Sequence, residues 1–295
     1  MSWRIESDEQ NVIQTAYHIL VASSPELLEQ GKGDIWDSGK IESDASQWIT
    51  YQGKTLKCNA PYYWKVKIDT NKGATNWSAP AFWTTGLFNE ADWQGQWIGL
   101  DRAAPGDSET QWSRLAARYL RKEFAVKKGV KRATVHIAGM GLYELFINGQ
   151  RIGNQVLAPA PTDYRKTILY NTYDVTSLLQ TENAIGVTLG NGRFYTMRQN
   201  YKPYKIPTFG YPKLRLNLIV EYADGSKETI ATNTSWKLTT EGPIRSNNEY
   251  DGEEYDARKE LGAWTQTGYD DNTWMPAQRV SIPSGTLRAQ MMPGM

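Results

Sequence analysis

The chain contains 295 residues, of which 40% are hydrophobic, and its 33 Lys and Arg residues against 32 Asp and Glu residues give a formal net charge of +1. This length predicts two domains, and scattered charges of nearly balanced sign give no electrostatic basis for binding nucleic acid or an anionic membrane. The mean hydropathy is −0.60, and no apolar run approaches the roughly 18 residues that a spanning helix requires, so we expect no membrane span.

Cysteine and histidine are too rare to build the usual metal or nucleophile sites. Cys58 is the single cysteine, which excludes an intrachain disulfide and a cysteine-based metal centre. The two histidines, His18 and His136, lie far apart in stretches with a strand pattern, so we interpret both as strand residues rather than as metal ligands or a catalytic base. We therefore expect no metal and no cofactor.

Aromatic residues are abundant, with 12 Trp and 17 Tyr. Aromatic rings stack on the apolar faces of sugars while Trp N–H and Tyr O–H groups supply hydrogen bonds, so the excess favours a carbohydrate-related function. The competing interpretation is that large all-β domains use these residues to fill their cores.

The first 88 residues predict a small β-sandwich. Strand patterns cover residues 14–21, 34–41, 62–68 and 81–86, and a turn is expected at 71–73. About seven short strands over this length are typical of an immunoglobulin-like sandwich. The last two strands also resemble those of a fibronectin type III domain.

Residues 89–117 predict a linker, because Trp93 and Trp97 are followed by a polar stretch that contains Ala, Pro and Gly. A second all-β domain is predicted over residues 118–280, with its clearest alternation at 213–222 and a hairpin turn after it. Residues 281–295 contain Pro, Gly and Met and are predicted to be an exit linker that leads into a downstream region.

The stretch 141–195 forms the centre of this second domain. Residues 142–147 alternate with the period of a half-buried strand, and Asn148-Gly149 suits a type I′ hairpin turn. A Pro-rich corner at 158–161, a cap for a short helical turn at 174–176 and a strand at 184–189 follow. The pattern predicts a β-sandwich with long loops at one end.

Several motifs follow one another along the second domain: GLYELFING at 141–149, VLAP at 156–159, TDY at 162–164, YDVT at 173–176, GNG at 190–192, YDGEEYDAR at 250–258, WMPA at 274–277 and LRAQ at 287–290. Together they resemble the N-terminal jelly-roll domain of bacterial α-L-rhamnosidases. Through QTAY at 14–17, WDSG at 36–39 and YYWKV at 62–66, the first domain resembles the immunoglobulin-like domain that precedes it in that family. The resemblance implies an all-β chain, an immunoglobulin-like β-sandwich followed by a jelly-roll (galactose-binding-like) β-sandwich.

In that family, terminal α-L-rhamnosyl bonds are hydrolysed with inversion by a later, helical (α/α)₆ barrel that supplies a general acid and a general base. Residues 1–295 have β patterns throughout. The resemblance therefore implies a non-catalytic accessory region without catalytic residues, inactive by itself. Its partners would be the downstream catalytic domain of the same polypeptide and a rhamnose-containing plant glycan.

Acidic residues concentrate at Asp251, Glu253, Glu254 and Asp256, close to Arg258. Two carboxylates at a suitable separation hydrolyse glycosidic bonds, and oxygen-rich clusters bind Ca²⁺. On a strand, Glu254, Asp256 and Arg258 would share one face. Pairing of the arginine with the carboxylates favours a structural or domain-docking role for this acidic motif.

Some jelly-roll domains of the family bind rhamnose with calcium, through an acidic and an amide residue that follow the tyrosine corresponding to Tyr164. Arg165 and Lys166 occupy those positions here, and cations do not ligate Ca²⁺. We expect no functional calcium site at this corner.

Amide, guanidinium and aromatic side chains, which are the types that sugar sites use, follow the strand at 184–189. The candidate substrate-binding residues are Asn191, Arg193, Tyr195, Arg198 and Tyr201. The alternatives are an ordinary surface loop and a loop that borders the active site of the downstream domain.

Two further functions stay open, a stand-alone carbohydrate-binding module for rhamnosides and a purely structural scaffold for domain docking. The jelly roll of a β-galactosidase-type enzyme has similar Asn-Gly hairpins, but it does not account for the acidic motif at 250–258. No signal peptide is visible in the N-terminal sequence MSWRIESDEQ, and we nevertheless expect a periplasmic or extracellular location.

Overall fold

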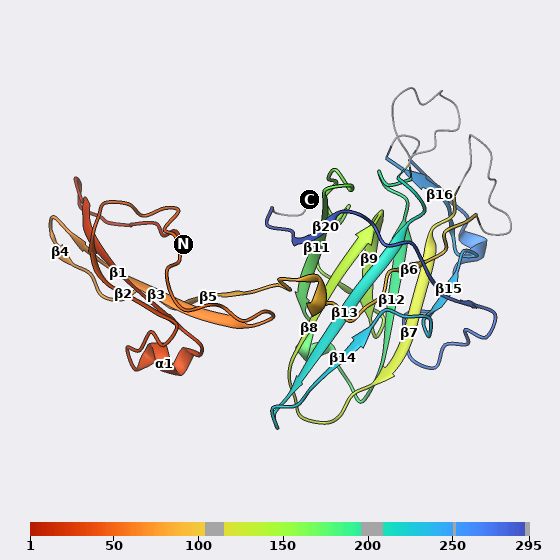
Figure 1. Cartoon of the computed structure of the whole chain (residues 1–295), viewed down its shortest axis with the longest axis horizontal. Coiled ribbons are helices and arrows are strands. Elements are labelled where there is room, and N and C mark those ends of the chain that lie inside the picture. The colour runs from red at the N-terminus through yellow and green to blue at the C-terminus, as the bar shows by residue number, and fades with distance from the viewer. Residues whose placement is uncertain (104–114, 196–208, 250–251, 293–295) are drawn as a thin grey trace. The chain divides into compact units, whose positions relative to one another are not determined.

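The computed structural model describes residues 1–103, 115–195, 209–249 and 252–292. The chain divides into two compact units, Met1–Gly86 and Leu87–Met295 (Figure 1). The described residues of both units form mainly β-strands, which confirms the all-β fold class.

Residues 1–86, all of which are described, contain one antiparallel sheet of five strands in the order β2-β1-β3-β4, with β5 also paired to β3. The elements are β1 (Gln14–Ala22), α1 (Pro25–Glu29), β2 (Trp36–Glu42), β3 (Pro61–Thr70), β4 (Gly73–Ala74) and β5 (Ala81–Thr84). His18 lies on β1 and contacts Asp37 of β2 at 2.6 Å, as expected of a strand residue.

Segments without regular secondary structure cover the sheet of the first unit, where we had expected further strands. The backbone N–H of Trp3 donates to Ser46, and that of Ile49 donates to Met1, so two segments run side by side without becoming strands. Their apolar side chains cover one face of the sheet, and Leu28 of α1 packs against the other. The expected count of about seven strands was wrong because isolated apolar residues fill this core without alternation.

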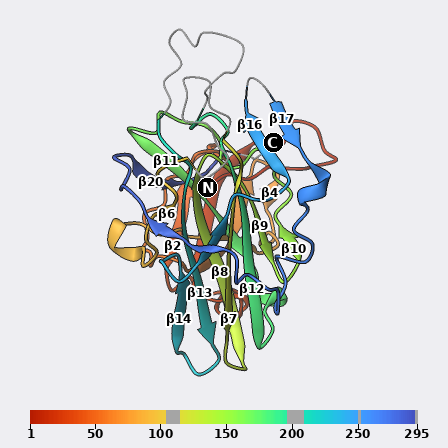
Figure 2. The same cartoon turned by 90° about the vertical axis from the view of Figure 1, so that its right-hand side faces the viewer.

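The second unit is a sandwich of two sheets, seen from two sides in Figures 1 and 2. Among the described residues, one sheet has six strands in the order β10-β9-β12-β7-β15-β18, and the other has the order β19-β6-β13-β8-β11-β20 with β14 added on β13. A small hairpin of β16 and β17 stands beside them.

The strands of this unit are β6 (Ile98–Gly99), β7 (Arg118–Ala125), β8 (Val130–Met140), β9 (Leu142–Ile147), β10 (Gln150–Ile152), β11 (Thr167–Asp174), β12 (Glu182–Gly190), β13 (Lys213–Tyr222), β14 (Lys227–Ala231), β15 (Lys237–Thr239), β16 (Ile244–Asn248), β17 (Gly252–Tyr255), β18 (Met275–Pro276), β19 (Gln278–Arg279) and β20 (Thr286–Ala289). Short 3₁₀ turns lie at Glu90–Asp92, Thr176–Leu178 and Ala257–Lys259.

Local signals placed several of these elements correctly. The alternating segments 142–147 and 213–222 form β9 and β13 with the same bounds. Asn148 and Gly149 have φ values of 51° and 83°, the positive values that a type I′ turn requires. Asp174 accepts a hydrogen bond from the backbone N–H of Thr176 at 2.9 Å, directly before the 3₁₀ turn, whose N-cap residue is Val175.

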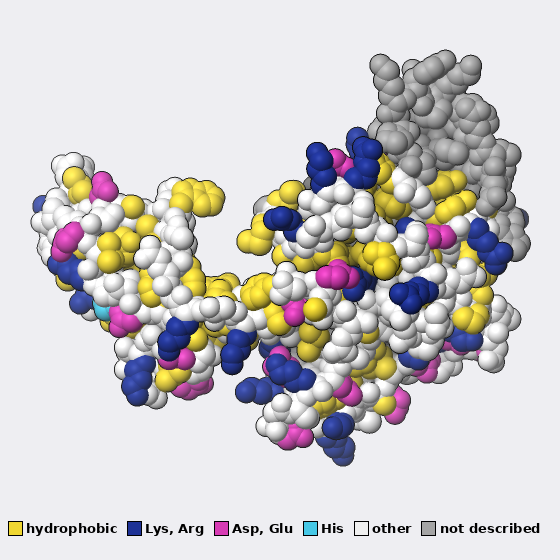
Figure 3. All heavy atoms as spheres, in the orientation of Figure 1, with side chains coloured by type: hydrophobic (Ala, Val, Ile, Leu, Met, Phe, Trp, Pro, Cys, Tyr) yellow, Lys and Arg dark blue, Asp and Glu magenta, His cyan; other side chains and the backbone are white. Residues whose placement is uncertain are grey.

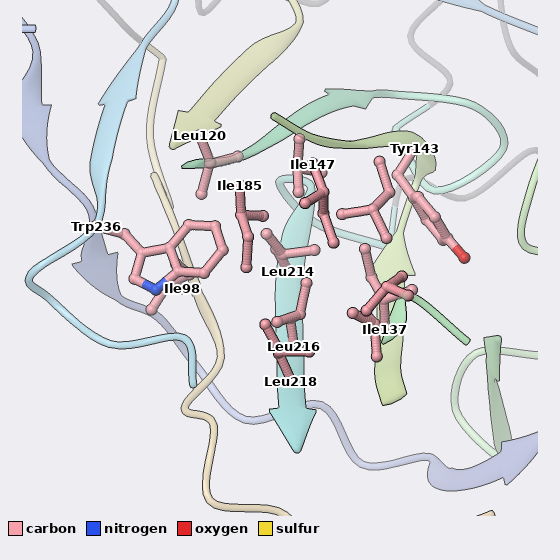
Figure 4. Packing of buried hydrophobic residues seen from close by; sticks show 14 of the residues in the cluster. Ile98, Leu120, Ile137, Tyr143, Ile147, Ile185, Leu214, Leu216, Leu218 and Trp236 are labelled. Atoms are coloured by element: carbon pink, nitrogen blue, oxygen red, sulfur yellow. The ribbon is translucent and has the colours of Figure 1, made fainter. Parts of the chain in front are cut away.

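The core of the second unit lies between its two sheets. Leu214, Leu216 and Leu218 point from β13 toward Ile185 of β12 and its neighbours (Figure 4). The ring of Trp236 lies at the edge of this cluster, fully buried, and its indole N–H donates to the Ala231 carbonyl at 3.0 Å. The period-two pattern of the sequence thus becomes one continuous apolar layer.

The predicted linker 89–117 is in part a structured component of the second unit. Its Gly95 N–H donates to the Asn217 side chain at 2.8 Å, and the Arg215 guanidinium donates to the Gly95 carbonyl at 2.6 Å. Trp93 and Trp97 are buried, and β6 pairs with β13. This correction has a physical reason: the polar side chains of β13 are buried and need partners, which the segment supplies.

The predicted exit linker 281–295 also contains a strand. Residues Thr286–Ala289 form β20, which pairs in parallel with β11, and its Leu287 packs against a second apolar cluster. The alternation is only four residues long, which is too short to be separated from a loop in the sequence.

Gly141 is expected to be irreplaceable for a geometric reason. It has a φ of +123°, and a Cβ atom added there would lie 2.1 Å from the carbonyl oxygen of Gly190. We predict that Gly141→Ala lowers the free energy of unfolding of the second unit by about 3 kcal/mol, through combined strain and steric conflict. Urea unfolding followed by hydrogen exchange, which separates the two units, measures this loss.

Gly225 provides the matched control. Its φ is +83°, and nothing lies within 4 Å of an added Cβ atom. Gly225→Ala therefore introduces backbone strain alone, and we expect a loss of about 1 kcal/mol. Equal losses of unfolding free energy in the two variants would show that the steric conflict with Gly190 does not contribute.

Candidate functional site at the loop end of the second unit

Three of the predicted site residues, Arg198, Tyr201 and Asp251, lie outside the residues that the structure describes. The remaining candidates occupy two places in the second unit. Asn191, Arg193 and Tyr195 follow β12, and Glu253 and Glu254 lie on β17, with Asp256 and Arg258 directly after it.

Asn191 is buried and acts as a structural clamp. Its side-chain amide donates to the Leu115 carbonyl at 2.7 Å, and its backbone N–H donates to the Asn247 side chain at 2.6 Å. The residue is only 2% exposed. It therefore ties the end of β12 to β16 and presents no polar group at the surface.

Arg193 is the most exposed of the three predicted residues after β12. Its guanidinium contacts Glu249 at 2.8 Å, and the two side chains are 47% and 32% exposed. An exposed pair of this kind adds little stability, but it holds a planar group of donors at the rim of the loops.

Tyr195 is 7% exposed and its ring stacks on that of Tyr211, with 5.6 Å between the ring centres. One ring face is thus already covered. The stacking role proposed for Tyr195 would need the opposite face, whereas its packing role is visible in the structure.

The acidic motif forms an exposed hairpin that ends in a capped turn. Glu253, Glu254 and Tyr255 are exposed on β17, whose partner is β16. Asp256 then caps the 3₁₀ turn Ala257–Lys259, and its carboxylate accepts from Arg258 at 2.8 Å. The expectation that Glu254, Asp256 and Arg258 share a strand face was wrong, because the strand ends at Tyr255.

The side chain of Arg258 fixes the charge of Asp256. Its hydrogen bonds hold the pKa of the Asp256 carboxyl at about 2, below its usual range. The carboxyl is therefore ionised at any physiological pH.

A concave part of the second unit lies between the corner at Tyr164 and the segment 281–284. It is a hollow of about 380 Å³, and its lining residues are Asp101, Met140, Tyr164, Arg165, Phe194, Phe209, Gly210, Tyr211, Lys213, Ser281, Ile282, Pro283 and Ser284. The corner and the loop after β12, two stretches singled out in the sequence, thus meet at one place.

Aromatic rings form one wall of this hollow. Tyr164 packs edge-on against Phe194 and against Phe209, with 5.2 Å between ring centres in both pairs. Burial raises the pKa of the Tyr164 phenol to about 12, so the group stays neutral.

A charged network contributes another part of the lining. The Lys213 ammonium donates to Asp101 at 2.5 Å and to the Ser281 hydroxyl at 2.8 Å. Burial alone would raise the pKa of Asp101, but the hydrogen bonds from Lys213 and Ser281 outweigh it and keep that pKa below its usual value.

Sequence reasoning missed Lys213, Asp101 and the 281–284 segment. Asp101 and Lys213 are 112 residues apart, and Asp101 and Ser281 are 180 apart. Periodicity reports only local structure, so no signal in the single sequence links these residues.

At the Tyr164 corner, Asp163 contacts Arg165 and Lys166, both at 3.5 Å. Within the described parts of the chain, no three His, Cys, Asp or Glu residues gather as a metal site would require. The same described residues contain no helix with the length and apolarity to cross a membrane.

The profile of the alpha-L-rhamnosidase N-terminal domain matches residues 128–295, more than half of the chain. The chain belongs to the family of alpha-L-rhamnosidase N-terminal domains. A second profile, described as Rha78A-like, N-terminal immunoglobulin domain, matches residues 1–89 of this family member. The resemblance stated from the sequence motifs is thereby confirmed.

Relatives and solved structures align with nearly all of this chain. An alpha-L-rhamnosidase of Formosa agariphila is 38% identical over 312 residues, which cover 99% of this chain and 33% of the relative. The solved alpha-L-rhamnosidase of Dictyoglumus thermophilum has a TM-score of 0.87 and 40% identity, and its alignment covers 99% of this chain and 33% of that structure. The solved alpha-L-rhamnosidase of Aspergillus terreus has a TM-score of 0.84 and 33% identity, and its alignment covers 96% of this chain and 32% of that structure. The chain thus spans about a third of the length of these relatives.

Proposed function

We propose that this chain is a non-catalytic accessory region of an α-L-rhamnosidase. Hydrolysis of terminal α-L-rhamnosyl bonds of plant glycans would then be carried out, with inversion, by a downstream catalytic domain of the same polypeptide. The observation that carries this proposal is the relation of lengths, because 99% of the chain aligns with only 33% of the Formosa agariphila relative.

Two carboxyl groups of the second unit, Asp256 and Asp101, lack the raised pKa that a general acid needs. An inverting glycosidase needs one carboxyl group that is still protonated near neutral pH and donates its proton to the leaving oxygen. Arg258 holds the pKa of Asp256 at about 2. The pKa of Asp101 also lies below its usual value, because the hydrogen bonds from Lys213 and Ser281 outweigh the effect of burial.

The exposed residues of the loop end have the chemistry of contact surfaces. Arg193, with its pair Glu249, is proposed to contact a rhamnose-containing glycan at the border of the catalytic domain. The hairpin with Glu253 and Glu254 is proposed to dock against that domain. On the coloured part of the second unit that faces the viewer in Figure 3, charged side chains of both signs are interspersed with apolar ones. We propose a periplasmic or extracellular location.

The direct test is an assay of the 295-residue chain with an aryl α-L-rhamnoside. We expect no release of the aryl group above the uncatalysed rate. Hydrolysis of the aryl rhamnoside by the purified chain would contradict the accessory role.

The reading frame separates the proposal from its alternative. We expect the gene to continue beyond codon 295 into a helical region. A stop codon at this point, together with measurable affinity of the chain for rhamnosides, would favour a stand-alone carbohydrate-binding module instead.

A further inference from the structure

Trp48 lies in the irregular segment after β2, and it is the only exposed tryptophan among those that the structure describes. The residue is 88% exposed, whereas the other described tryptophans are buried or half-buried. Within the described part of the chain, no aromatic ring and no cation packs on its indole. Both faces of this ring are therefore open to a ligand.

The backbone of Trp48 has a conformation that a bulky residue disfavours. Its φ is +58°, in the left-handed region, where a Cβ atom comes too close to the carbonyl oxygen. Glycine adopts this conformation without that conflict. Trp48 thus lowers the stability of the fold through its backbone, and burial of its indole does not compensate for this. Because folding does not account for a tryptophan at this position, the strain points to a role in binding.

Hydrogen bonds hold the backbone on both sides of this strained position. The N–H of Trp48 donates to the Ser2 hydroxyl at 3.1 Å, and the N–H of Ile49 donates to the Met1 carbonyl at 2.9 Å. The side chain of Ile49 packs against the apolar cluster of the first unit. The indole is therefore presented from a fixed segment, and a ligand does not have to order that segment when it binds.

The groups around Trp48 suit a sugar ring better than a protein partner. A stable protein interface buries about 800 Å² on each side and surrounds an aromatic anchor with further contacts. The exposed residues that flank Trp48 along the chain are polar, Gln47 and Thr50, and the Ser2 hydroxyl lies at its backbone. A flat aromatic ring beside amide and hydroxyl groups matches a pyranose, which has an apolar C–H face and hydroxyl groups around its edge.

We propose that Trp48 is a stacking platform for one pyranose ring of a glycan. The choice of a glycan as the ligand class rests on the proposed accessory role in glycan hydrolysis. The contact itself goes beyond that role, because it gives the first unit, residues 1–86, a ligand contact of its own.

The indole N–H signals of the ¹⁵N-labelled 295-residue chain report this contact. The signal of Trp48 is identified by its loss in the Trp48→Gly variant. On titration with methyl α-L-rhamnoside we expect this signal to shift saturably, with a dissociation constant on the order of 10 mM, because one stacked ring makes few other contacts. Glycerol, which has hydroxyl groups but no ring face, should cause no saturable shift.

Three variants separate a ligand platform from a packing residue. Trp48→Gly removes the ring and the backbone strain, so the first unit should keep its stability or gain some, while saturation transfer from the protein to the sugar is lost. Trp48→Phe keeps a smaller ring and should weaken binding about threefold. Phe82→Ala is the matched control, because Phe82 is another exposed aromatic residue of the first unit, at 69%, and its loss should leave the shift of the Trp48 signal unchanged.

Urea unfolding followed by hydrogen exchange of residues 1–86 measures the stability of the variants. A less stable first unit in Trp48→Gly would show that the indole packs within the fold, and this would overturn the proposal. Saturation transfer that persists in Trp48→Gly, or the absence of a saturable shift in the millimolar range, overturns it as well.

A second copy of the chain is the alternative occupant of the indole. A Trp48 signal that changes with protein concentration in the absence of sugar would show this and would overturn the proposal. Hydrolysis of an aryl rhamnoside by the chain would contradict the accessory role but not the contact at Trp48, because the two assays share no readout.

Discussion

Replacing Arg121 with Met is expected to lower the free energy of unfolding of the second unit by about 3–5 kcal/mol, the cost of breaking a buried charge network from one side. Arg121 lies on β7 and its side chain is 1% exposed. Its Nε donates to the Trp264 carbonyl at 2.9 Å, and a terminal nitrogen donates to the Gln266 carbonyl at 3.0 Å. The guanidinium also pairs with Asp271.

This one side chain therefore holds a long irregular segment on the six-stranded sheet. Without it, three backbone carbonyls lose a donor, those of Trp264, Gln266 and Tyr269. The carboxylates of Asp271 and Glu123 lose their partner as well. Trp264 and Trp274, which pack near Tyr119, would then no longer be held in place. Urea unfolding followed by hydrogen exchange measures the loss and shows whether residues around Trp264 become unprotected first.

Two controls sharpen the result for Arg121. Arg121→Lys keeps the charge but not the fork of donors, so we expect it to recover only part of the stability. Arg258→Met removes an arginine whose side chain is 89% exposed, and no measurable change is expected. A loss for Arg121→Met as small as that for Arg258→Met would refute the clamping role.

Acidification from pH 6.5 to pH 4 is expected to destabilise the second unit by about 3 kcal/mol through His136, because each unit of pKa difference corresponds to about 1.36 kcal/mol. Burial, together with the charge of Arg132, lowers the pKa of His136 from 6.5 to about 4. The ring lies in β8, where its Nδ1 contacts the Thr172 hydroxyl at 3.0 Å.

The sign follows from proton uptake. Between pH 6.5 and pH 4 the unfolded chain binds a proton at this histidine while the folded chain does not, so the unfolded state is favoured progressively. Above pH 6.5 neither state is protonated, and the contribution of His136 to stability is complete. Carboxyl groups with lowered pKa begin to lose their contribution only at about pH 5, so the first part of the window reports His136 alone.

Urea unfolding at pH 7, 6, 5 and 4 provides the measurement. His136→Gln stays neutral at every pH, so it should show only the decline that carboxyl groups cause below about pH 5. The other histidine, His18, belongs to the first unit. A parallel decline in the His136→Gln variant would show that a different group is responsible.

The two histidines illustrate which features a single sequence predicts and which it does not. The strand patterns around them predicted strand residues, and both lie in strands. The depth of His136 depends on Trp93 and Tyr170, which pack around it from other segments. A local sequence pattern therefore could not predict the lowered pKa of His136.

For the candidate site too, the sequence indicated some features and only the structure showed the others. The corner at Tyr164 and the loop with Arg193 were recognised from their residue types, but not their meeting at one hollow. Asn191 and Tyr195 have the composition of sugar-binding residues, yet both are buried in packing contacts. Residue type indicates what a side chain is able to bind, whereas exposure decides whether it is available.

The sequence by itself determined the strands β9 and β13, the Asn148-Gly149 turn between β9 and β10, and the ordered motifs that indicate the family. These features depend on alternation and turn chemistry within a few residues. Only the tertiary structure decided that Arg215 and Asn217 are buried under residues 89–97, that Arg121 clamps a distant segment, and that Asp101 meets Lys213. The physical reason is that a buried polar group must find partners, and these lie more than a hundred residues away along the chain.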